Sequence, residues 1–139
     1  MKEEEIREGK IRVVLVEPGK YAREAEISIS PSEMQEICGG EIYLSYPFDE
    51  KVCLVYTEEG KIYGFPLNRG IKDMKTGELI NIIAGTFFIC DCSTKKFGSL
   101  SQEQVDRYLE RFRKPERFYP IDGEIYVVSY DPRATALER

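Results

Sequence analysis

Short apolar segments along the chain predict a strand-rich fold. Residues 11–16 form a continuous β-branched and apolar run, which is typical of a buried strand. Residues 25–29 alternate apolar and polar side chains, and the turn signal Pro18-Gly19 before them predicts a hairpin with the first strand. Similar patterns predict strands over 41–46, 52–56, 61–65, 82–92 and 124–130. The residues between strands 52–56 and 61–65, Thr57-Glu58-Glu59-Gly60, are interpreted as a hairpin loop with Gly60 at positive φ.

Two segments have the capping residues that mark the start and the end of a helix. The first covers residues 31–38, with Ser30 and Glu33 as a capping box and Gly39 as the left-handed stop. The second begins after Ser101, where Gln104 completes another capping box, and it ends before Pro115. Because these helices fall between strands without strict alternation, we predict an α+β fold. It has a mostly antiparallel sheet of about six or seven strands and two short helices.

Two places interrupt the strand pattern. Residues 66–70, Pro-Leu-Asn-Arg-Gly, are predicted to be irregular. Gly85, inside the apolar run 82–92, indicates a bulge or a close approach of another group to the backbone.

The length of 139 residues fits one unit, with a charged, frayed N-terminus over residues 1–10 and a single α+β domain over 11–139. A hydrophobic fraction of 42% supplies a core without a metal or a disulfide. No apolar run approaches the ~18–20 residues of a membrane span, and the N-terminus lacks the apolar part of a secretory signal. We therefore expect a cytoplasmic protein with no membrane partner. The formal charge of −5 speaks against DNA or RNA as a partner.

The four cysteines are Cys38, Cys53, Cys90 and Cys92. Two disulfides or a zinc site are formally open, but a reducing compartment and the spacing favour buried free thiols. The chain has no histidine, the commonest general base, and its carboxylate runs are typical of solvated surface. We predict no metal, no cofactor and no enzymatic activity.

The predicted second helix carries a basic stripe of Arg107, Arg111 and Lys114. Glu103 precedes Arg107 by four residues and Glu110 precedes Lys114 by four, so a salt-bridged solvent face is favoured over an anion-binding surface.

The segment Tyr63 to Gly70 is the strongest candidate for ligand binding. It places the amide of Asn68 and the guanidinium of Arg69 beside aromatic residues, and such groups hold planar or anionic ligands. Two alternatives stay open: Asn68 satisfies its own turn backbone, and Arg69 pairs with a surface carboxylate.

Three groups of segments together resemble the domain-of-unknown-function family 3846. They are Val14-Leu15-Val16-Glu17-Pro18-Gly19-Lys20; Gly39-Gly40-Glu41-Ile42 with Thr57-Glu58-Glu59-Gly60 and Pro66-Leu67-Asn68-Arg69; and Ile83-Ala84-Gly85-Thr86-Phe87 with Phe97-Gly98-Ser99-Leu100. The resemblance covers about residues 11–115, and the family occurs in phages and mobile elements of Gram-positive bacteria. The resemblance implies the genetic context in which the protein occurs, and it does not imply a ligand or a reaction.

That setting suggests a non-enzymatic binding protein that counters host defence, acting in the host cytoplasm and sequestering a small nucleotide-like signal. In this hypothesis Arg69 holds a phosphate, Asn68 a base or ribose edge and Thr86 a further oxygen, and Tyr63 stacks. A homo-oligomer fits, because so small a unit forms a deep pocket more easily between subunits. The alternative is a protein–protein inhibitor of a host defence or nucleic-acid-handling protein.

Overall fold

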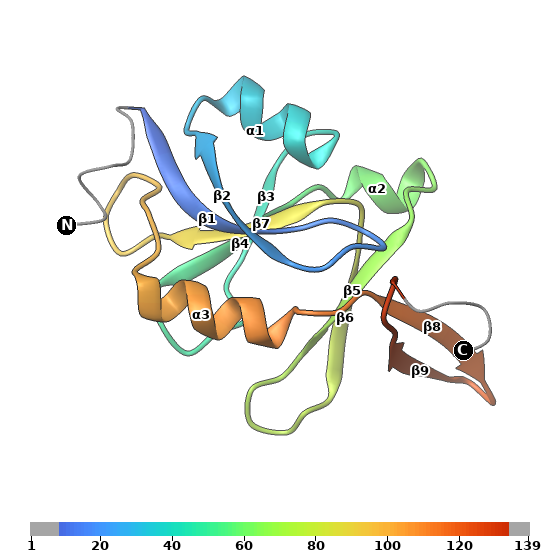
Figure 1. The fold of residues 1–139 in the computed structure, drawn as a ribbon. Coiled ribbons are helices and arrows are strands. Elements are labelled where there is room, and N and C mark those ends of the chain that lie inside the picture. The colour runs from blue at the N-terminus through green and yellow to red at the C-terminus, as the bar shows by residue number, and fades with distance from the viewer. Residues whose placement is uncertain (1–8, 134–139) are drawn as a thin grey trace.

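A five-stranded sheet in the order β2-β1-β7-β4-β3 forms the centre of the computed structural model, which describes residues 9–133 (Figure 1). Its strands are β1 (Lys10–Val16), β2 (Arg23–Ser28), β3 (Tyr43–Ser45), β4 (Val52–Tyr56) and β7 (Phe87–Asp91). Every neighbouring pair in it is antiparallel. The inner strands β1, β4 and β7 are buried on both faces, which explains why their sequences are continuous apolar runs.

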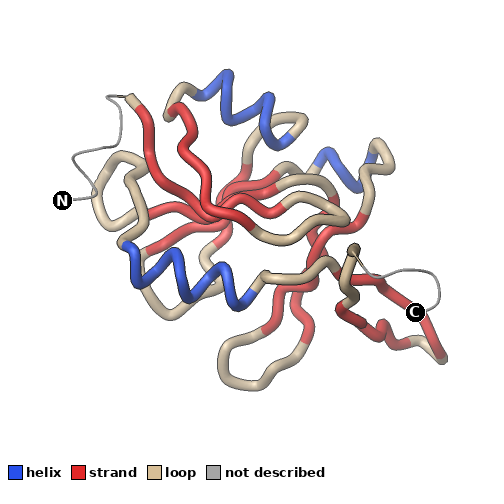
Figure 2. Tube along the Cα trace, in the orientation of Figure 1, coloured by secondary structure: helices blue, strands red, loops and turns tan. Residues whose placement is uncertain are grey.

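Different helices cover the two faces of this sheet. Helix α1 (Pro31–Cys38) packs on the face formed by Val13, Leu15 and their neighbours. Helix α3 (Gln102–Arg111) and the hairpin of β5 (Leu67–Lys72) and β6 (Leu79–Ala84) cover the opposite face, as Figure 2 shows. The remaining elements are the one-turn helix α2 (Glu59–Ile62) and a hairpin of β8 (Glu116–Ile121) and β9 (Glu124–Ser129).

The predicted α+β class with mostly antiparallel strands is confirmed, although the described residues contain nine strands and three helices. Helix α1 has the predicted bounds, and Gly39 ends it with φ of 90°. The predicted capping box at its start is wrong, because the Ser30 hydroxyl bonds to that of Ser32 and makes no cap bond. At α3 the capping box of Ser101 and Gln104 is confirmed.

The predicted hairpin loop over 57–60 and strand over 61–65 are wrong, since this stretch contains α2. The Thr57 hydroxyl accepts a hydrogen bond from the Glu59 backbone N–H (3.3 Å) at the start of that helix. Gly60 has ordinary negative φ, and a Cβ built on it would lie 2.6 Å from the carbonyl oxygen of Ala84. The glycine is therefore needed for close packing of α2 on β6, not for a turn.

Two further predictions are corrected, and one strand was missed. Residues 67–72, expected to be largely irregular, form β5. The run 82–92 is divided between β6 and β7, with Gly85 at φ of 85° between them. Strand β8, which contains Pro120 and follows Pro115, was not predicted.

The predicted frayed N-terminus lies outside the described residues over positions 1–8, and Lys10 is the first residue of β1. None of the described helices combines the length and hydrophobicity that crossing a membrane requires. The cysteines are free as predicted, with Cys92 half-buried and the other three buried. The thiols of Cys53 and Cys90 lie 3.6 Å apart across β4 and β7.

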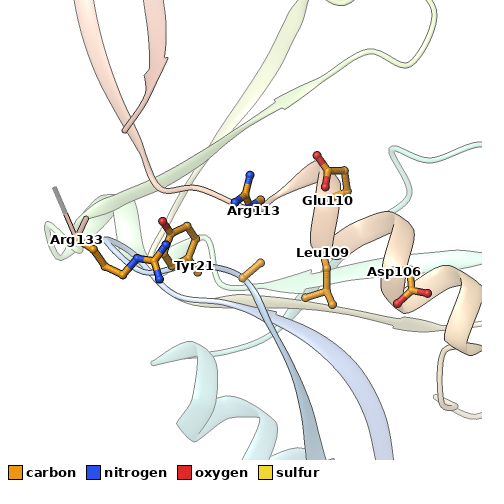
Figure 3. A pocket seen from close by; sticks show the side chains of 7 residues that line it. Tyr21, Asp106, Leu109, Glu110, Arg113 and Arg133 are labelled. Carbon is orange, nitrogen blue, oxygen red and sulfur yellow. The ribbon is translucent and has the colours of Figure 1, made fainter. Parts of the chain in front are cut away.

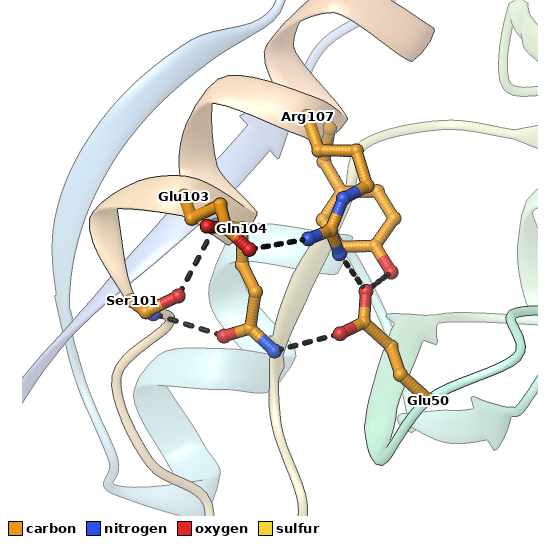
Figure 4. Close-up of polar contacts among 6 residues, drawn as sticks. Glu50, Ser101, Glu103, Gln104 and Arg107 are labelled. Carbon is orange, nitrogen blue, oxygen red and sulfur yellow. Dashed lines mark hydrogen bonds and ion pairs between the residues drawn. The ribbon is translucent and has the colours of Figure 1, made fainter.

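Helix α3 is fixed to the loop before β4 by the carboxylate of Glu50 (Figure 4). Gln104 donates to one oxygen at 3.0 Å, while Arg107 and the Tyr108 hydroxyl donate to the other. Burial acts to raise the pKa of Glu50, but these hydrogen bonds and the charge of Arg107 hold it below its ordinary value. Arg107 also pairs with Glu103 as predicted, so this part of the basic stripe is salt-bridged.

Candidate functional site

Asn68 and Arg69, two of the predicted ligand-binding residues, lie in the interior at the start of β5. Both are almost completely excluded from solvent, with relative exposures of 0% and 1%. The Asn68 amide donates to the carbonyls of Val16 and Gly85, each at 2.9 Å. These two carbonyls come from the end of β1 and from the turn between β6 and β7, so one side chain ties both segments to β5.

The Arg69 guanidinium binds carbonyls from two further segments. Its Nε and Nη2 donate to the Phe112 carbonyl at 3.2 and 3.0 Å, and Nη2 also donates to the Lys20 carbonyl at 2.7 Å. Its Nη1 donates to Asn68 Oδ1 at 2.8 Å. The pair therefore joins the β1–β2 turn, the end of α3 and the β6–β7 turn to one strand.

The charge of Arg69 is retained in this environment. Burial lowers the pKa of Arg69 to about 10, with Glu116 and Tyr130 acting in the opposite direction. The group thus stays protonated at neutral pH. Neither sequence-based alternative describes the two side chains: the Asn68 amide donates to remote carbonyls, and Arg69 forms no ion pair with a carboxylate within residues 9–133. Its donors are already engaged by the chain's own oxygens, and direct contact with a ligand stays a prediction.

Tyr63 and Thr86, the other predicted ligand-binding residues, lie in different surroundings. Tyr63 follows α2 and is 69% exposed. Thr86 is half-buried in the β6–β7 turn and lines a pocket of about 400 Å³. Tyr63 is not among the residues that line this pocket, so the structure does not unite the four predicted residues in one site.

The pocket at Thr86 is the stronger candidate site, and we call it the turn pocket. Its lining residues come from the β1–β2 turn, the end of α1, the α2–β5 loop and the β6–β7 turn. They are Glu17, Pro18, Lys20, Ile37, Cys38, Gly39, Phe65, Pro66, Gly85 and Thr86. Most of them lie within the sequence segments that carry the family resemblance, although those segments are far apart in the chain.

The ring of Phe65 shapes one wall of the turn pocket. A Cβ built on Gly39, Gly60 or Gly85 would lie 2.8 to 2.9 Å from a carbon of this ring. Three glycines from three different segments therefore form a cradle that only bare backbone can provide. The Gly85 N–H donates to the Pro66 carbonyl at 2.8 Å, which fixes the loop that carries the ring.

The charges around the turn pocket favour an anion. Glu17 is paired with Arg23 at 3.2 Å, whereas the side chain of Lys20 has no ion-pair partner within residues 9–133. The Arg69 guanidinium lies beneath the Lys20 backbone, to which it donates. The end of α1 also lines the pocket and opposes an anion, but a helix end is equivalent to only about half a charge. Two whole positive charges outweigh it.

The thiol in this pocket is not prepared for nucleophilic chemistry. Burial raises the pKa of Cys38 to about 12, and its Sγ lies 3.7 Å from the Val55 carbonyl as a hydrogen-bond donor. The thiol therefore stays protonated at neutral pH. Across the described residues, no cluster of His, Cys, Asp and Glu side chains has a geometry suited to a metal ion.

A second pocket of about 430 Å³ lies between the β1–β2 turn and α3, and Figure 3 shows its side chains. The guanidinium of Arg133 stacks on the Tyr21 ring at 4.7 Å, and the Tyr21 hydroxyl donates to Asp131 at 2.6 Å. The aromatic face is thus already occupied. Asp106 and Glu110 contribute two carboxylates to the same pocket, and Arg113 and Arg133 contribute two guanidinium groups, so the lining has no net formal charge.

Sequence reasoning missed Lys20 as a site residue, because Pro18-Gly19-Lys20 was interpreted as only a turn. Phe65 was considered together with Tyr63 as an aromatic residue that could stack on a ring, but only Tyr63 was placed in the predicted site. Their position within or next to the resembling segments was the available signal, but their meeting in space is a property of the tertiary structure.

The structure defines an α+β protein with an antiparallel central sheet and a pocket whose walls are held by a buried amide and guanidinium. The chain belongs to the family described as "Domain of unknown function (DUF3846)", whose model matches residues 11–113. No curated protein and no solved structure matches it. The match includes every residue that lines the turn pocket and excludes the β8–β9 hairpin.

Proposed function

We propose that this protein is a non-enzymatic binding protein of phage or mobile-element origin that sequesters a small, anionic, nucleotide-like ligand in the turn pocket. Removing such a signal from the host cytoplasm would counter a host defence system. The observation that carries the proposal is the convergence of the family-resembling segments around one pocket, where Lys20 has no ion-pair partner among the described residues. A volume of about 400 Å³ is within the range of small-molecule sites.

Each wall of the turn pocket has a distinct role in this proposal. Lys20 binds the phosphate, and the Thr86 hydroxyl donates to a second oxygen. Phe65, between Pro18 and Pro66, offers an apolar surface for a planar base. Arg69 acts on the ligand through its electric field and by fixing the Lys20 backbone, in place of the direct contact first expected.

Isothermal titration calorimetry with a panel of linear and cyclic nucleotides tests this function. We expect binding to the wild-type protein, weakened about tenfold or more in Lys20→Ala because a charge-assisted contact is lost. Thr86→Val should weaken it less, since a neutral hydrogen bond is worth about 1 kcal/mol. Lys75→Ala, a charge removal in the exposed β5–β6 turn, is the matched control. Absence of heat across the panel, or equal binding by Lys20→Ala and the control, would refute the proposal.

A second candidate function, inhibition of a host protein by direct binding, is favoured by a separate surface. Ile62 and Tyr63, adjacent residues at the end of α2, are 76% and 69% exposed, the highest values among large apolar side chains of the described residues. Adjacent exposed apolar side chains are a feature of protein interfaces. A pull-down from host lysate tests this function. It predicts a stoichiometric protein partner that Ile62→Ala/Tyr63→Ala loses and Lys20→Ala retains.

A further inference from the structure

The β8–β9 hairpin presents apolar side chains to solvent. Five of them are between 42% and 50% exposed: Tyr119, Ile121, Ile125, Tyr126 and Val128. The register places four of them, Tyr119, Ile121, Tyr126 and Val128, on one face of the hairpin. The other face, which carries Phe118, Ile125 and Val127, packs on β5, where a Cβ built on Gly70 would lie 3.6 Å from Phe118 and 3.5 Å from Val127. A two-stranded hairpin is marginally stable by itself, and an exposed apolar face on one indicates an interaction surface.

One hydrogen bond fixes which backbone groups of this hairpin point outward. The Tyr130 N–H donates to the Pro115 carbonyl at 3.0 Å, and the register places these residues opposite each other. Hydrogen-bonded and non-hydrogen-bonded pairs alternate along an antiparallel ladder. The pair of Pro120 and Ile125 is therefore non-hydrogen-bonded, so the backbone groups of both residues point away from the partner strand.

The two edges of the hairpin consequently differ. On β8, the outward position 120 is a proline, which has no N–H to offer and protects the edge. On β9, the outward groups belong to Ile125, Val127 and Ser129, which have all their donors and acceptors. Among residues 9–133, β9 pairs only with β8, and it carries no lysine, proline or bulge that would protect its free edge.

We propose that this edge pairs antiparallel with β9 of a second copy of the chain. Outward-pointing residues of one strand must lie opposite outward-pointing residues of the other. The register that uses all three outward residues places Val127 opposite Val127 of the second copy, and Ile125 opposite its Ser129. The same register sets Tyr126 opposite the second copy's Val128, a favourable aromatic and β-branched pair. The product is a four-stranded sheet across a two-fold axis.

Charge complementarity identifies the occupant as a second copy. In this register Glu124 lies opposite the second copy's Tyr130. The guanidinium of Arg117 stacks on the Tyr130 ring of its own chain at 4.2 Å from the centroid. Each Glu124 carboxylate therefore meets the Arg117 of the other chain, and the two-fold axis repeats the pair. Since the hairpin lies outside residues 11–113, this association belongs to the chain's C-terminal extension rather than to the family region.

Sedimentation of the full chain over a range of concentrations tests the proposal, and we expect a reversible dimer. Ser129→Pro removes two outward donors from the dimer and no bond within the hairpin, so it should weaken association about tenfold or more. Ser129→Ala keeps those donors and should associate like the wild type. Thermal unfolding should be similar for both variants.

A charge exchange gives a second readout. Glu124→Arg and Arg117→Glu should each weaken the dimer by about tenfold, because two symmetry-related pairs become repulsive, and the double variant should restore it. A wild-type chain that stays monomeric up to about 1 mM overturns the proposal. So does a dimer that neither Ser129→Pro nor the single charge reversals weaken.

Discussion

Replacement of Arg69 by methionine should destabilise the fold strongly. The change keeps most of the aliphatic stem and removes the donors to Phe112, Lys20 and Asn68 Oδ1. Each buried acceptor left without a partner costs about 1–3 kcal/mol, so three such groups amount to about 3–9 kcal/mol. Because methionine also avoids the burial of a charge, we expect a net loss of about 3 kcal/mol in the free energy of unfolding. For a chain of this length, that corresponds to about 10 °C in Tm.

Urea unfolding followed by circular dichroism measures this loss. Arg113→Met is the matched control, because that side chain is exposed, and it should change the free energy by less than about 0.5 kcal/mol. Arg69→Lys should be intermediate, since an ammonium keeps the charge but cannot reproduce the guanidinium fork. A loss below about 0.5 kcal/mol in Arg69→Met, as small as that of the control, would refute the reasoning that these hydrogen bonds hold the three segments together.

Three further changes have expected outcomes. Gly60→Ala should cost about 1–3 kcal/mol in urea unfolding although alanine favours helices, because its Cβ would meet the Ala84 carbonyl; a gain in stability would contradict the observed packing. Glu50→Gln should destabilise the protein by about 1 kcal/mol at pH 7. Because the folded-state pKa of Glu50 lies below 4.5, its contribution is present above that pH and is lost as pH falls through the folded pKa. The two proteins should therefore converge at pH values below the folded-state pKa, and a constant difference would exclude this origin. In native alkylation followed by mass spectrometry, half-buried Cys92 should react before Cys38. Cys38 is buried, and burial raises its pKa to about 12. The reverse order of reaction would contradict the described burial.

Local signals in the sequence predicted the elements that local chemistry determines. Gly39 ended α1 where expected, and Ser101 with Gln104 began α3, because capping depends on residues a few positions apart. The continuous apolar run of β1 likewise indicated a strand buried on both faces.

The failures lie where distant groups decide the structure. Residues 57–60 have the composition of a turn, but Gly60 is held in a helical turn by its packing against β6. Asn68 and Arg69 resemble loop residues because polar side chains rarely enter a core, and only the carbonyls of remote segments make their burial tolerable. No pattern within a short window contains that information.

The cradle around Phe65 also constrains how this protein can change over time. At each of its three glycines the ring leaves no room for a methyl group. Gly39 and Gly85 are also held as glycine by their positive φ of 90° and 85°, whereas Gly60 has ordinary helical backbone and additionally faces the Ala84 carbonyl. A relative with a smaller residue at position 65 can therefore carry alanine at position 60 once that carbonyl shifts, while positions 39 and 85 remain glycine. The ring and Gly60 should be exchanged together in evolution, although the two other glycines of the cradle should not follow them.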